Sequence, residues 1–343
     1  MSNKIDFVVT WLDSSDPVWQ KQYLEFKNNH SKSRTEQARF RNMDIFRYWF
    51  RAVETYAPWV NKVYLVTNGV FPKWINKDNP KLVLVNHSDY IPKEFLPTFN
   101  SHTIELHMHK IKGLSEHFVY FNDDMFINAP IMPNYYFQDG LPCDSNVESV
   151  NNVPSYNKED KFGIHMIVLA NIGVINSFFN RKDVVNHSKK KWYGFHLGKR
   201  GILTSMFLTY ICKTKRFVGF KTYHLEQPYL KSSFVEGWNH AEDLLNKSCT
   251  PFREEVQLSP YFFRYWQLAS NRFYPTNLKR GKLFSLQKDN IDIINEALKT
   301  QEYSSICLND TANCSEEDFK YIKNKLHIFF EEKFPNISSF EIK

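Results

Sequence analysis

The sequence lacks the cysteine patterns that would define its class at once. It has five cysteines, an odd number, with no CxxC pair and no histidine at zinc-finger spacing. A disulfide framework and a structural zinc site are therefore not expected, and we interpret the thiols as reduced, as in a cytosolic protein. Internal repeats and low-complexity runs are also missing, which argues against a repeat protein and against extended disorder.

Long hydrophobic runs are absent as well. Residues 1–6 enter a predicted strand directly, without the charged and apolar regions of a secretory signal. The longest mostly apolar helix candidate, residues 202–212, is far shorter than the ~20 residues that span a bilayer. We therefore expect a cytoplasmic protein, with any membrane contact peripheral and at the inner face of the plasma membrane.

What the sequence does contain is apolar bulk and positive charge. Of 343 residues, 42% are hydrophobic and 16% aromatic, which suffices for the core of one large or two modest domains. The formal net charge is +7, with a basic cluster at residues 189–191 and 199–200. This charge fits a phosphate-bearing substrate or an anionic membrane surface. No stripe of basic and aromatic residues indicates nucleic-acid binding.

The first 130 residues alternate between apolar stretches typical of buried strands and segments with helical periodicity. The predicted strands are residues 5–12, 62–67, 81–85 and 117–121, and the predicted helices are 42–56 and 101–112. This order favours an α/β fold with a mostly parallel sheet covered by helices. Residues 138–160 are predicted to form a loop or lid, and residues 165–175 a strand or a buried helix.

The C-terminal part has a different character. From about residue 200 the chain is predicted to be mainly helical. Residues 315–334 begin with a capping-box pattern and place apolar side chains at helical spacing. This last helix packs on its own domain, forms an oligomer or docks on a membrane; the pattern alone does not decide which.

Polar side chains follow the predicted strands where each strand ends. Asp13 follows the first strand, Asn68 the second, His87 and Asp89 the third, and Asn122, Asp123 and Asp124 the last one. In open parallel sheets, ligands bind outside the carboxyl ends of the strands. Four strands that bring polar groups to one edge therefore predict a binding site there.

The strongest cation signal is the run Asn122, Asp123 and Asp124. Mg²⁺ and Mn²⁺ prefer oxygen ligands and are often held by one or two carboxylates together with substrate phosphates. In an extended chain Asn122 and Asp124 point to one side and Asp123 to the other, and a turn would bring both acids together. The alternative is an ordinary solvated turn.

Two helices carry further candidates. His102, Glu105 and His109 share a stripe of the helix 101–112, where they could bind a metal or phosphate, transfer protons, or form an exposed polar face. Arg47 and Arg51 share a face of the first helix, with Arg41 next to it, and fit either phosphate binding or a solvated surface. By spacing alone, His224 and Arg253 are interpreted as structural.

Several of these stretches together resemble the Stealth family of sugar-phosphate transferases. The first motif is IDFVVTWLDSSDP at residues 5–17, and the second runs from RFRN at residues 39–42 to YFNDDMF at residues 120–126. The resemblance covers residues 5–19 and 39–131 closely. It is weaker at HLEQP, residues 224–228, and at residues 253–265.

The resemblance implies a GT-A-like nucleotide-binding core, a UDP-sugar donor, a divalent cation, Mg²⁺ or Mn²⁺, and a glycan or lipid-linked oligosaccharide as acceptor. A hexose 1-phosphate would be transferred to an acceptor hydroxyl in capsule or exopolysaccharide synthesis, with release of UMP. Asp13 and Lys110 stand where eukaryotic relatives carry Asn and Arg, which leaves the donor preference open. An ordinary GT-A hexosyltransferase that releases UDP, and a non-catalytic glycan-binding protein, are the alternatives.

Residues 1–198 would then form the catalytic core and residues 199–343 a mainly helical part that completes the active site, in a monomer or a homo-oligomer. We expect a cation held by Asn122, Asp123 and Asp124. The expected catalytic residues are Asp124, His224, Arg253 and His109, with His224 the first candidate and His109 the second for the base. The expected substrate-binding residues are Trp11, Asp13, Arg41, Arg47, Asn68, Ser101 and Asn171.

Overall fold

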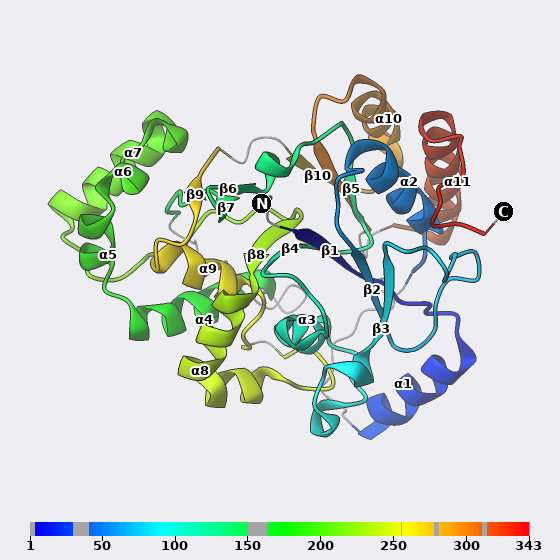
Figure 1. Cartoon of the computed structure of the whole chain (residues 1–343), viewed down its shortest axis with the longest axis horizontal. Helices are drawn as coiled ribbons and strands as arrows, with labels where there is room; N and C mark the ends of the chain where they lie inside the picture. Colours follow the sequence, from blue (N-terminus) through cyan, green and yellow to red (C-terminus); the bar gives the residue numbers. More distant parts are fainter. Residues whose placement is uncertain are drawn as a thin grey trace.

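A five-stranded sheet forms the centre of the structure, a computed structural model that describes residues 4–29, 41–149, 163–254, 256–277, 281–310 and 314–342 (Figure 1). Its strand order is β3-β2-β1-β4-β8. The strands are β1 (Ile5–Thr10), β2 (Val63–Thr67), β3 (Leu82–Asn86), β4 (His117–Phe121) and β8 (Gln227–Leu230). The first four run parallel and β8 pairs antiparallel with β4. The predicted mostly parallel α/β sheet is therefore confirmed.

Two small sheets join segments that are far apart in the sequence. One contains β10 (Gly281–Ser285), β11 (Ser305–Asn309) and β5 (Met125–Ile127). The other contains β6 (Phe137–Gln138), β7 (Leu141–Asp144) and β9 (Tyr274–Pro275). Because β11 pairs antiparallel with β5, with Cys307 opposite Met125, the C-terminal region lies directly beside the end of β4.

Helices cover both faces of the central sheet. Alternating side chains of β1 enter different cores, with Phe7 and Val9 on one face and Val8 on the other. The first face is covered by α2 (Phe46–Tyr56), α10 (Ile291–Thr300) and α11 (Glu316–Lys333), and the second by α3 (Ser101–Leu106), α4 (Gly163–Phe178), α8 (Lys231–Ser248) and α9 (Tyr261–Ala269). Helix α1 (Pro17–Asn29) follows β1.

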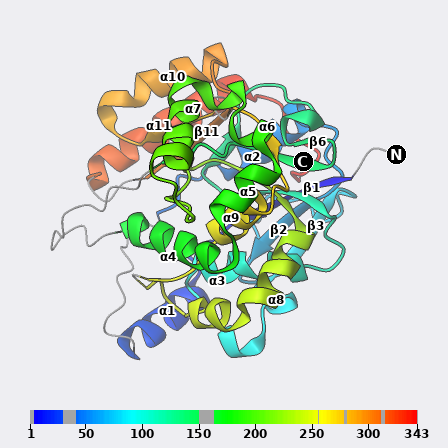
Figure 2. The ribbon, with the colours of Figure 1, turned by 90° about the vertical axis from the view of Figure 1, so that its left-hand side faces the viewer.

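A group of short helices extends from the second face. It comprises α5 (Arg181–His187), α6 (Lys189–Trp192), α7 (Gly198–Met206) and the π-helix η7 (Phe207–Ile211). Figure 2 shows these helices side by side on the face turned to the viewer. Arg181 joins the group to the core through a buried ion pair with Glu148, at 2.6 Å. We call residues 181–221 the basic lobe.

Short 3₁₀ helices make up the remaining helical turns. They are η2 (His87–Asp89), η3 (Lys93–Phe95), η4 (Met108–Lys110), η5 (Pro133–Tyr135), η6 (Phe195–Leu197) and η8 (Lys288–Asn290). The helix predicted over residues 101–112 is divided by one of them. The α-helix ends at Leu106 and η4 follows, because His107 leaves the helical conformation at ψ 0° and its ring nitrogen Nδ1 bonds to the Thr103 carbonyl.

The structure resolves several alternatives left by the sequence. Residues 165–175 lie in helix α4, not in a strand. The C-terminal helix α11 buries Ile322, Leu326, Phe329 and Phe330 against the domain, so this face is not available to a membrane. Residues 199–343 are largely helical, yet β8, β10 and β11 of this part join the sheets of the core. Of the proposed lid, residues 150–160 lie outside the described residues.

Among the described residues, no helix is both long and apolar enough to cross a bilayer.

Candidate active site

The acidic turn after β4 is held in place by the C-terminal half of the chain. Within the turn, the Met125 amide donates to the Asn122 carbonyl at 3.2 Å. From β11, the Leu308 amide donates to the carbonyl of Asp124 at 2.8 Å. Strand β5 starts directly after the turn and pairs with β11. Asp124 is therefore held next to β11, a strand that is far from it in the sequence and that no local sequence pattern links to it.

Asp124 meets His224 and Cys307 at this turn. One carboxylate oxygen of Asp124, a ring nitrogen of His224 and the Cys307 sulfur lie within 4.8 Å of one another. Burial and the nearby Asp124 carboxylate raise the pKa of the Cys307 thiol, which hydrogen-bonds to Asp124. The thiol therefore remains protonated and acts as a donor to the carboxylate, which fixes the orientation of the acid.

The cluster has the chemistry of a divalent-cation site. Burial raises the pKa of Asp124, while the His224 ring opposes this effect. The Oδ1 atom of Asp124 is buried and has no hydrogen-bond partner. A buried carboxylate oxygen without a partner is costly unless a cation or a donor satisfies it. The Asp124 carboxylate and the His224 imidazole are both ligand types that bind divalent cations.

The three residues predicted to share a cation do not share one role in the structure. The Asn122 Oδ1 atom accepts a hydrogen bond from the Tyr120 hydroxyl at 2.6 Å, so this oxygen is already used. Asp123 is accessible to solvent although protein surrounds it, and desolvation together with the Asp124 charge raises its pKa. Only Asp124 is placed with other ligand-type side chains in the described part of the chain.

A second buried acid, Glu105, lies beside the same strand end. Its carboxylate hydrogen-bonds to Ser101 and to the Tyr120 hydroxyl, which also contacts Thr10 Oγ1 at 3.1 Å. Burial raises the pKa of Glu105 to about 7, against the opposing charge of Arg253. A carboxyl group with a pKa near neutrality is suited to proton transfer at physiological pH. Sequence analysis noted Glu105 on the helical stripe but did not assign it to the site.

Arg253 completes this group from a distant part of the chain. Its guanidinium donates to the Ser101 hydroxyl and its charge acts on Glu105. The Arg253 side chain is exposed, so it can also contact a substrate. The structure thus brings Ser101 and Arg253, two sequence-predicted residues, into one network with Glu105.

Other predicted residues lie at the ends of β1 and β2. Asn68, directly after β2, has a buried Oδ1 atom without a hydrogen-bond partner, and Arg47 has a buried Nε atom in the same condition. The Trp11 ring stacks on Phe46, with 6.0 Å between ring centroids. Asp13 accepts hydrogen bonds from the backbone amide and hydroxyl of Ser15 and stabilises its own turn.

Two predicted residues lie in the interior and do not face the acidic turn. The His109 ring packs on Phe234 and Trp238, and burial lowers its pKa to about 3, so it stays neutral. Asn171 is fully buried between α4 and α9, where its amide group bonds to Ser259 and to a carbonyl of its own helix. His109 was predicted from its place on the helical stripe before the acidic strand and Asn171 as a substrate-binding residue; in the structure both pack inside the helical layer, and their roles stay predictions.

Arg41 is engaged elsewhere. Its guanidinium forms a two-point ion pair with Asp310, at 2.8 and 3.0 Å, and donates to the Cys314 carbonyl. It also lies over the Phe319 ring at 4.8 Å. These contacts connect the start of the second motif with the segment between β11 and α11, which indicates a structural role.

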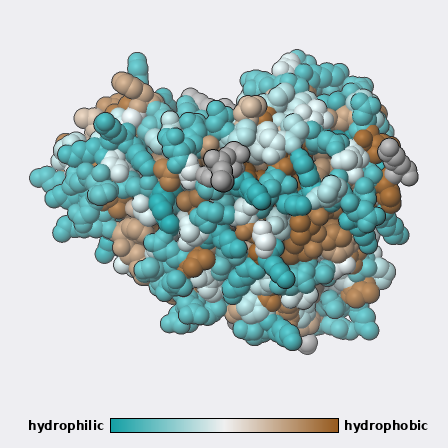
Figure 3. All heavy atoms as spheres, viewed as in Figure 1, coloured by the Kyte–Doolittle hydropathy of each residue, from teal (hydrophilic) through white to brown (hydrophobic). Residues whose placement is uncertain are grey.

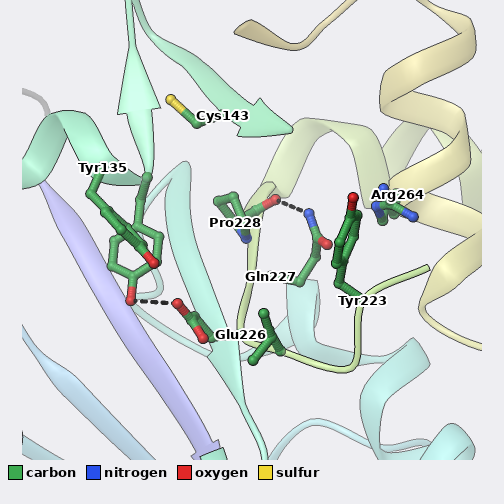
Figure 4. Close-up of a pocket in the computed structure, with 9 residues that line it drawn as sticks. Tyr135, Cys143, Tyr223, Glu226, Gln227, Pro228 and Arg264 are labelled. Carbon is green, nitrogen blue, oxygen red and sulfur yellow. Dashed lines mark hydrogen bonds between the residues drawn. The ribbon is translucent and has the colours of Figure 1, made fainter. Parts of the chain in front are cut away.

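A small cavity lies beside the segment that leads into β8 (Figure 4). Tyr223, Glu226, Gln227 and Arg264 are among the residues that line it. Arg264 pairs with Asp144 at 2.9 Å through two nitrogens, whereas its Nη1 atom is buried without a partner. With a volume of about 30 Å³ the cavity holds roughly two waters and is too small for a sugar.

The fold and the side chains at this sheet edge define an α/β protein with a candidate divalent-cation site beside the end of β4. The model for Stealth protein CR2, conserved region 2, matches residues 39–143. The capsular polysaccharide phosphotransferase WcwK of Streptococcus pneumoniae is 39% identical, over 99% of this chain and 98% of that protein. The receptor polysaccharide phosphotransferase WefC of Streptococcus oralis is 35% identical, over 99% of this chain and 100% of that protein. The chain therefore belongs to the Stealth family of bacterial polysaccharide phosphotransferases.

Among solved structures, the apo form of the bifunctional glycosyltransferase WbbM aligns with 98% of this chain and 52% of its own, with 9% identity and a TM-score of 0.43. This likeness is too distant to decide the activity.

Proposed function

We propose that the protein transfers a hexose or N-acetylhexosamine 1-phosphate from a UDP-sugar to a hydroxyl of a growing glycan in capsule or cell-surface polysaccharide synthesis. The acceptor oxygen forms a bond to the β-phosphorus, the bond from that phosphorus to the UMP oxygen breaks, and the acceptor proton passes to a base. The observation that carries this proposal is the buried, unpartnered oxygen of Asp124, beside His224, at the carboxyl end of β4. The full-length similarity to polysaccharide phosphotransferases supports the reaction type.

Asp124 and His224 would hold the cation, Mg²⁺ or Mn²⁺, with Asp123 at the solvent side. A divalent ion supplies charge neutralisation on the diphosphate and on the departing UMP. The unpartnered Asp124 oxygen and the neighbouring imidazole supply the matching ligands. Cys307 acts as a positioning residue, because its thiol hydrogen-bonds to the Asp124 carboxylate.

Glu105 takes the proton of the acceptor hydroxyl in this proposal, and Arg253 neutralises charge on the phosphoryl oxygens. The buried carboxylate with a pKa of about 7 can accept a proton at neutral pH and return it to solvent. Arg253 lies beside it and reaches solvent, which suits a group that closes on a phosphate. In a second assignment His224 takes the proton, and the variants described in the Discussion separate the two.

Residues at the ends of β1 and β2 and at the start of α2 would hold the nucleotide. Asn68 offers a buried carbonyl-type oxygen and Arg47 a buried N–H, both without a partner in the protein. The Trp11 ring, directly after β1, stacks on Phe46, the residue that precedes Arg47. Unpaired polar groups next to an aromatic face fit recognition of a uracil ring and ribose.

Analysis of the released nucleotide tests the reaction. The protein is incubated with a UDP-sugar panel, Mn²⁺ and a glycan acceptor, and the products are separated by chromatography and mass spectrometry. We expect UMP together with an acceptor whose mass increases by a hexose phosphate. UDP with an acceptor that gains only a hexose would identify a hexosyltransferase instead. Absence of any metal-dependent nucleotide release across the panel would support a glycan-binding protein.

A further inference from the structure

The positive charge of the protein is concentrated in the basic lobe. Residues 181–221 contain eleven lysines and arginines and one acidic residue, Asp183, a net charge of +10. The whole chain carries +7, so the remainder is net negative, at −3. Nine of these basic side chains are exposed: Lys182, Lys189, Lys190, Lys199, Arg200, Lys213, Lys215, Arg216 and Lys221. The lobe is therefore a separate basic surface on a protein that is otherwise slightly acidic.

The same lobe exposes large apolar side chains along one helix. Leu203, Met206, Phe207, Tyr210 and Ile211 follow one another at the i, i+3, i+4, i+7 and i+8 spacing of a helical face, and all five are exposed. This pattern ordinarily faces the core of a domain. Here the buried positions of the helix are Gly201, Ser205 and Leu208 instead, so the apolar face points outward.

Phe195 in η6 adds to this surface. Its side chain is 97% exposed, against 69% for Ile211 and 66% for Leu203. Figure 3 shows brown spheres among teal ones at the end of the lobe, in the upper left of the view. Single exposed apolar residues are common, but six in one short segment indicate a surface that binds something.

From the combination of exposed apolar side chains and basic residues we infer that the basic lobe docks on an anionic phospholipid surface. Helices of this kind lie in the headgroup region with the apolar face toward the acyl chains. Lysines and arginines beside that face are attracted to anionic headgroups. The inference depends on the lobe alone and not on the proposed reaction. It assigns membrane contact to α7 and η7, whereas the buried face of α11 cannot supply it.

Vesicle binding tests the inference. The full chain is sedimented with vesicles of phosphatidylcholine alone and of phosphatidylcholine mixed with phosphatidylglycerol. We expect binding to the anionic vesicles only, weakened by salt. The variant Leu203→Ser/Ile211→Ser should lose at least about tenfold in partitioning, because two large apolar side chains no longer enter the lipid. Lys199→Glu/Arg200→Glu should weaken binding to a similar degree.

Matched controls change equally exposed residues outside the lobe. Ile293→Ser, at 56% exposure on α10, and Lys77→Glu/Lys320→Glu should bind vesicles like the unchanged protein. Circular dichroism of every variant confirms that the fold is retained. Equal losses in the control and lobe variants would overturn the inference, as would absence of binding to anionic vesicles.

Two other binding partners of the basic lobe would give different results in these experiments. If a second copy of the chain covers the apolar face, the protein sediments as a dimer without vesicles and Leu203→Ser/Ile211→Ser makes it monomeric, which overturns the membrane assignment. If the lobe binds polyanions in general, polyphosphate binds it as tightly as the vesicles do and the apolar variant keeps its affinity for both. That result also overturns the assignment.

Discussion

The edge of the central sheet and the basic lobe depart from the usual distribution of side chains in opposite ways. At the sheet edge, acids are buried: the Glu105 residue is 7% exposed and an oxygen of Asp124 has no partner. In the lobe, apolar side chains such as Phe195 and Ile211 are exposed. Polar residues normally lie outside and large apolar residues inside. Each departure costs stability in the isolated chain, and a ligand of the matching chemistry would relieve it: a cation and phosphates at the edge, and lipid at the lobe.

Removal of Asp124 should have the largest effect. In Asp124→Ala we expect turnover to fall by about a thousandfold or more, since the charge that faces the diphosphate is lost. Folding should be retained, because the change removes a buried carboxylate that has an unsatisfied oxygen. Steady-state UMP release and thermal unfolding measure the two quantities. The control Asp243→Ala, an exposed acid on α8, should leave both unchanged.

His224→Ala separates the two roles open to this side chain. If His224 binds the cation, the variant needs a higher Mn²⁺ concentration for half-maximal activity and regains much of its turnover when Mn²⁺ is raised. If His224 is the base, turnover remains low at every Mn²⁺ concentration. The second result would contradict our assignment of the proton to Glu105.

Substitution of Glu105 should have the next largest effect. It should lower the activity and raise the stability of the protein. Glu105→Gln should lower turnover about a hundredfold or more, because the amide cannot accept the proton. In the unchanged enzyme, activity should rise with pH through about 7, the pKa at which Glu105 becomes ionised. A pH profile without a step near neutrality would contradict this role.

The stability effect of the same variant follows from the raised pKa. Between the ordinary value of 4.5 and about 7, native Glu105 holds a proton that the unfolded chain has released. The free energy of unfolding should therefore fall as pH rises through this window and level off above it. Glu105→Gln removes the dependence, and at pH 8 it should be more stable by up to about 3 kcal/mol. Urea unfolding at pH 5 and pH 8 measures the difference, with Glu242→Gln, exposed on α8, as the control.

The smallest effect on folding is expected in the lobe. Leu203→Ser/Ile211→Ser should change the free energy of unfolding in solution by no more than about 0.5 kcal/mol per site, since both side chains are exposed. A much larger loss, measured by urea unfolding without lipid, would show that the apolar face packs within the protein. The lobe would then have an ordinary distribution of side chains, and its contrast with the buried acids of the sheet edge would no longer hold.

The position of the site was predictable because parallel strands share an edge. Polar residues at the ends of the first, second and fourth strands had to meet once the strands were identified, and Asn68 and Asp124 lie there with unpaired oxygens. The family motif added His224 and Arg253, which spacing alone left as structural. Both lie beside buried acids.

The other features of the candidate site and of the basic lobe depend on packing between distant segments, which local sequence patterns do not reveal. Cys307 reaches Asp124 only through the pairing of β11 with β5, and nothing in the local pattern of residues 305–309 indicates that pairing. His109 packs against Trp238, and Asn171 hydrogen-bonds to Ser259 between packed helices. The residue type alone does not distinguish such a structural role from a role at the site. An apolar stripe on a helix usually predicts a face that packs on the core, whereas the apolar face of α7 points to solvent.

The insertion of β11 beside the acidic turn has a consequence for synthesis of the chain. Asp124 acquires its neighbour Cys307 and the backbone bond from Leu308 only after residues 305–309 have been synthesised, roughly 180 residues after the acidic turn itself. A nascent or truncated chain can form most of the parallel sheet and still lack a finished cation site. The candidate site is thus completed later in synthesis than the four parallel strands that carry it.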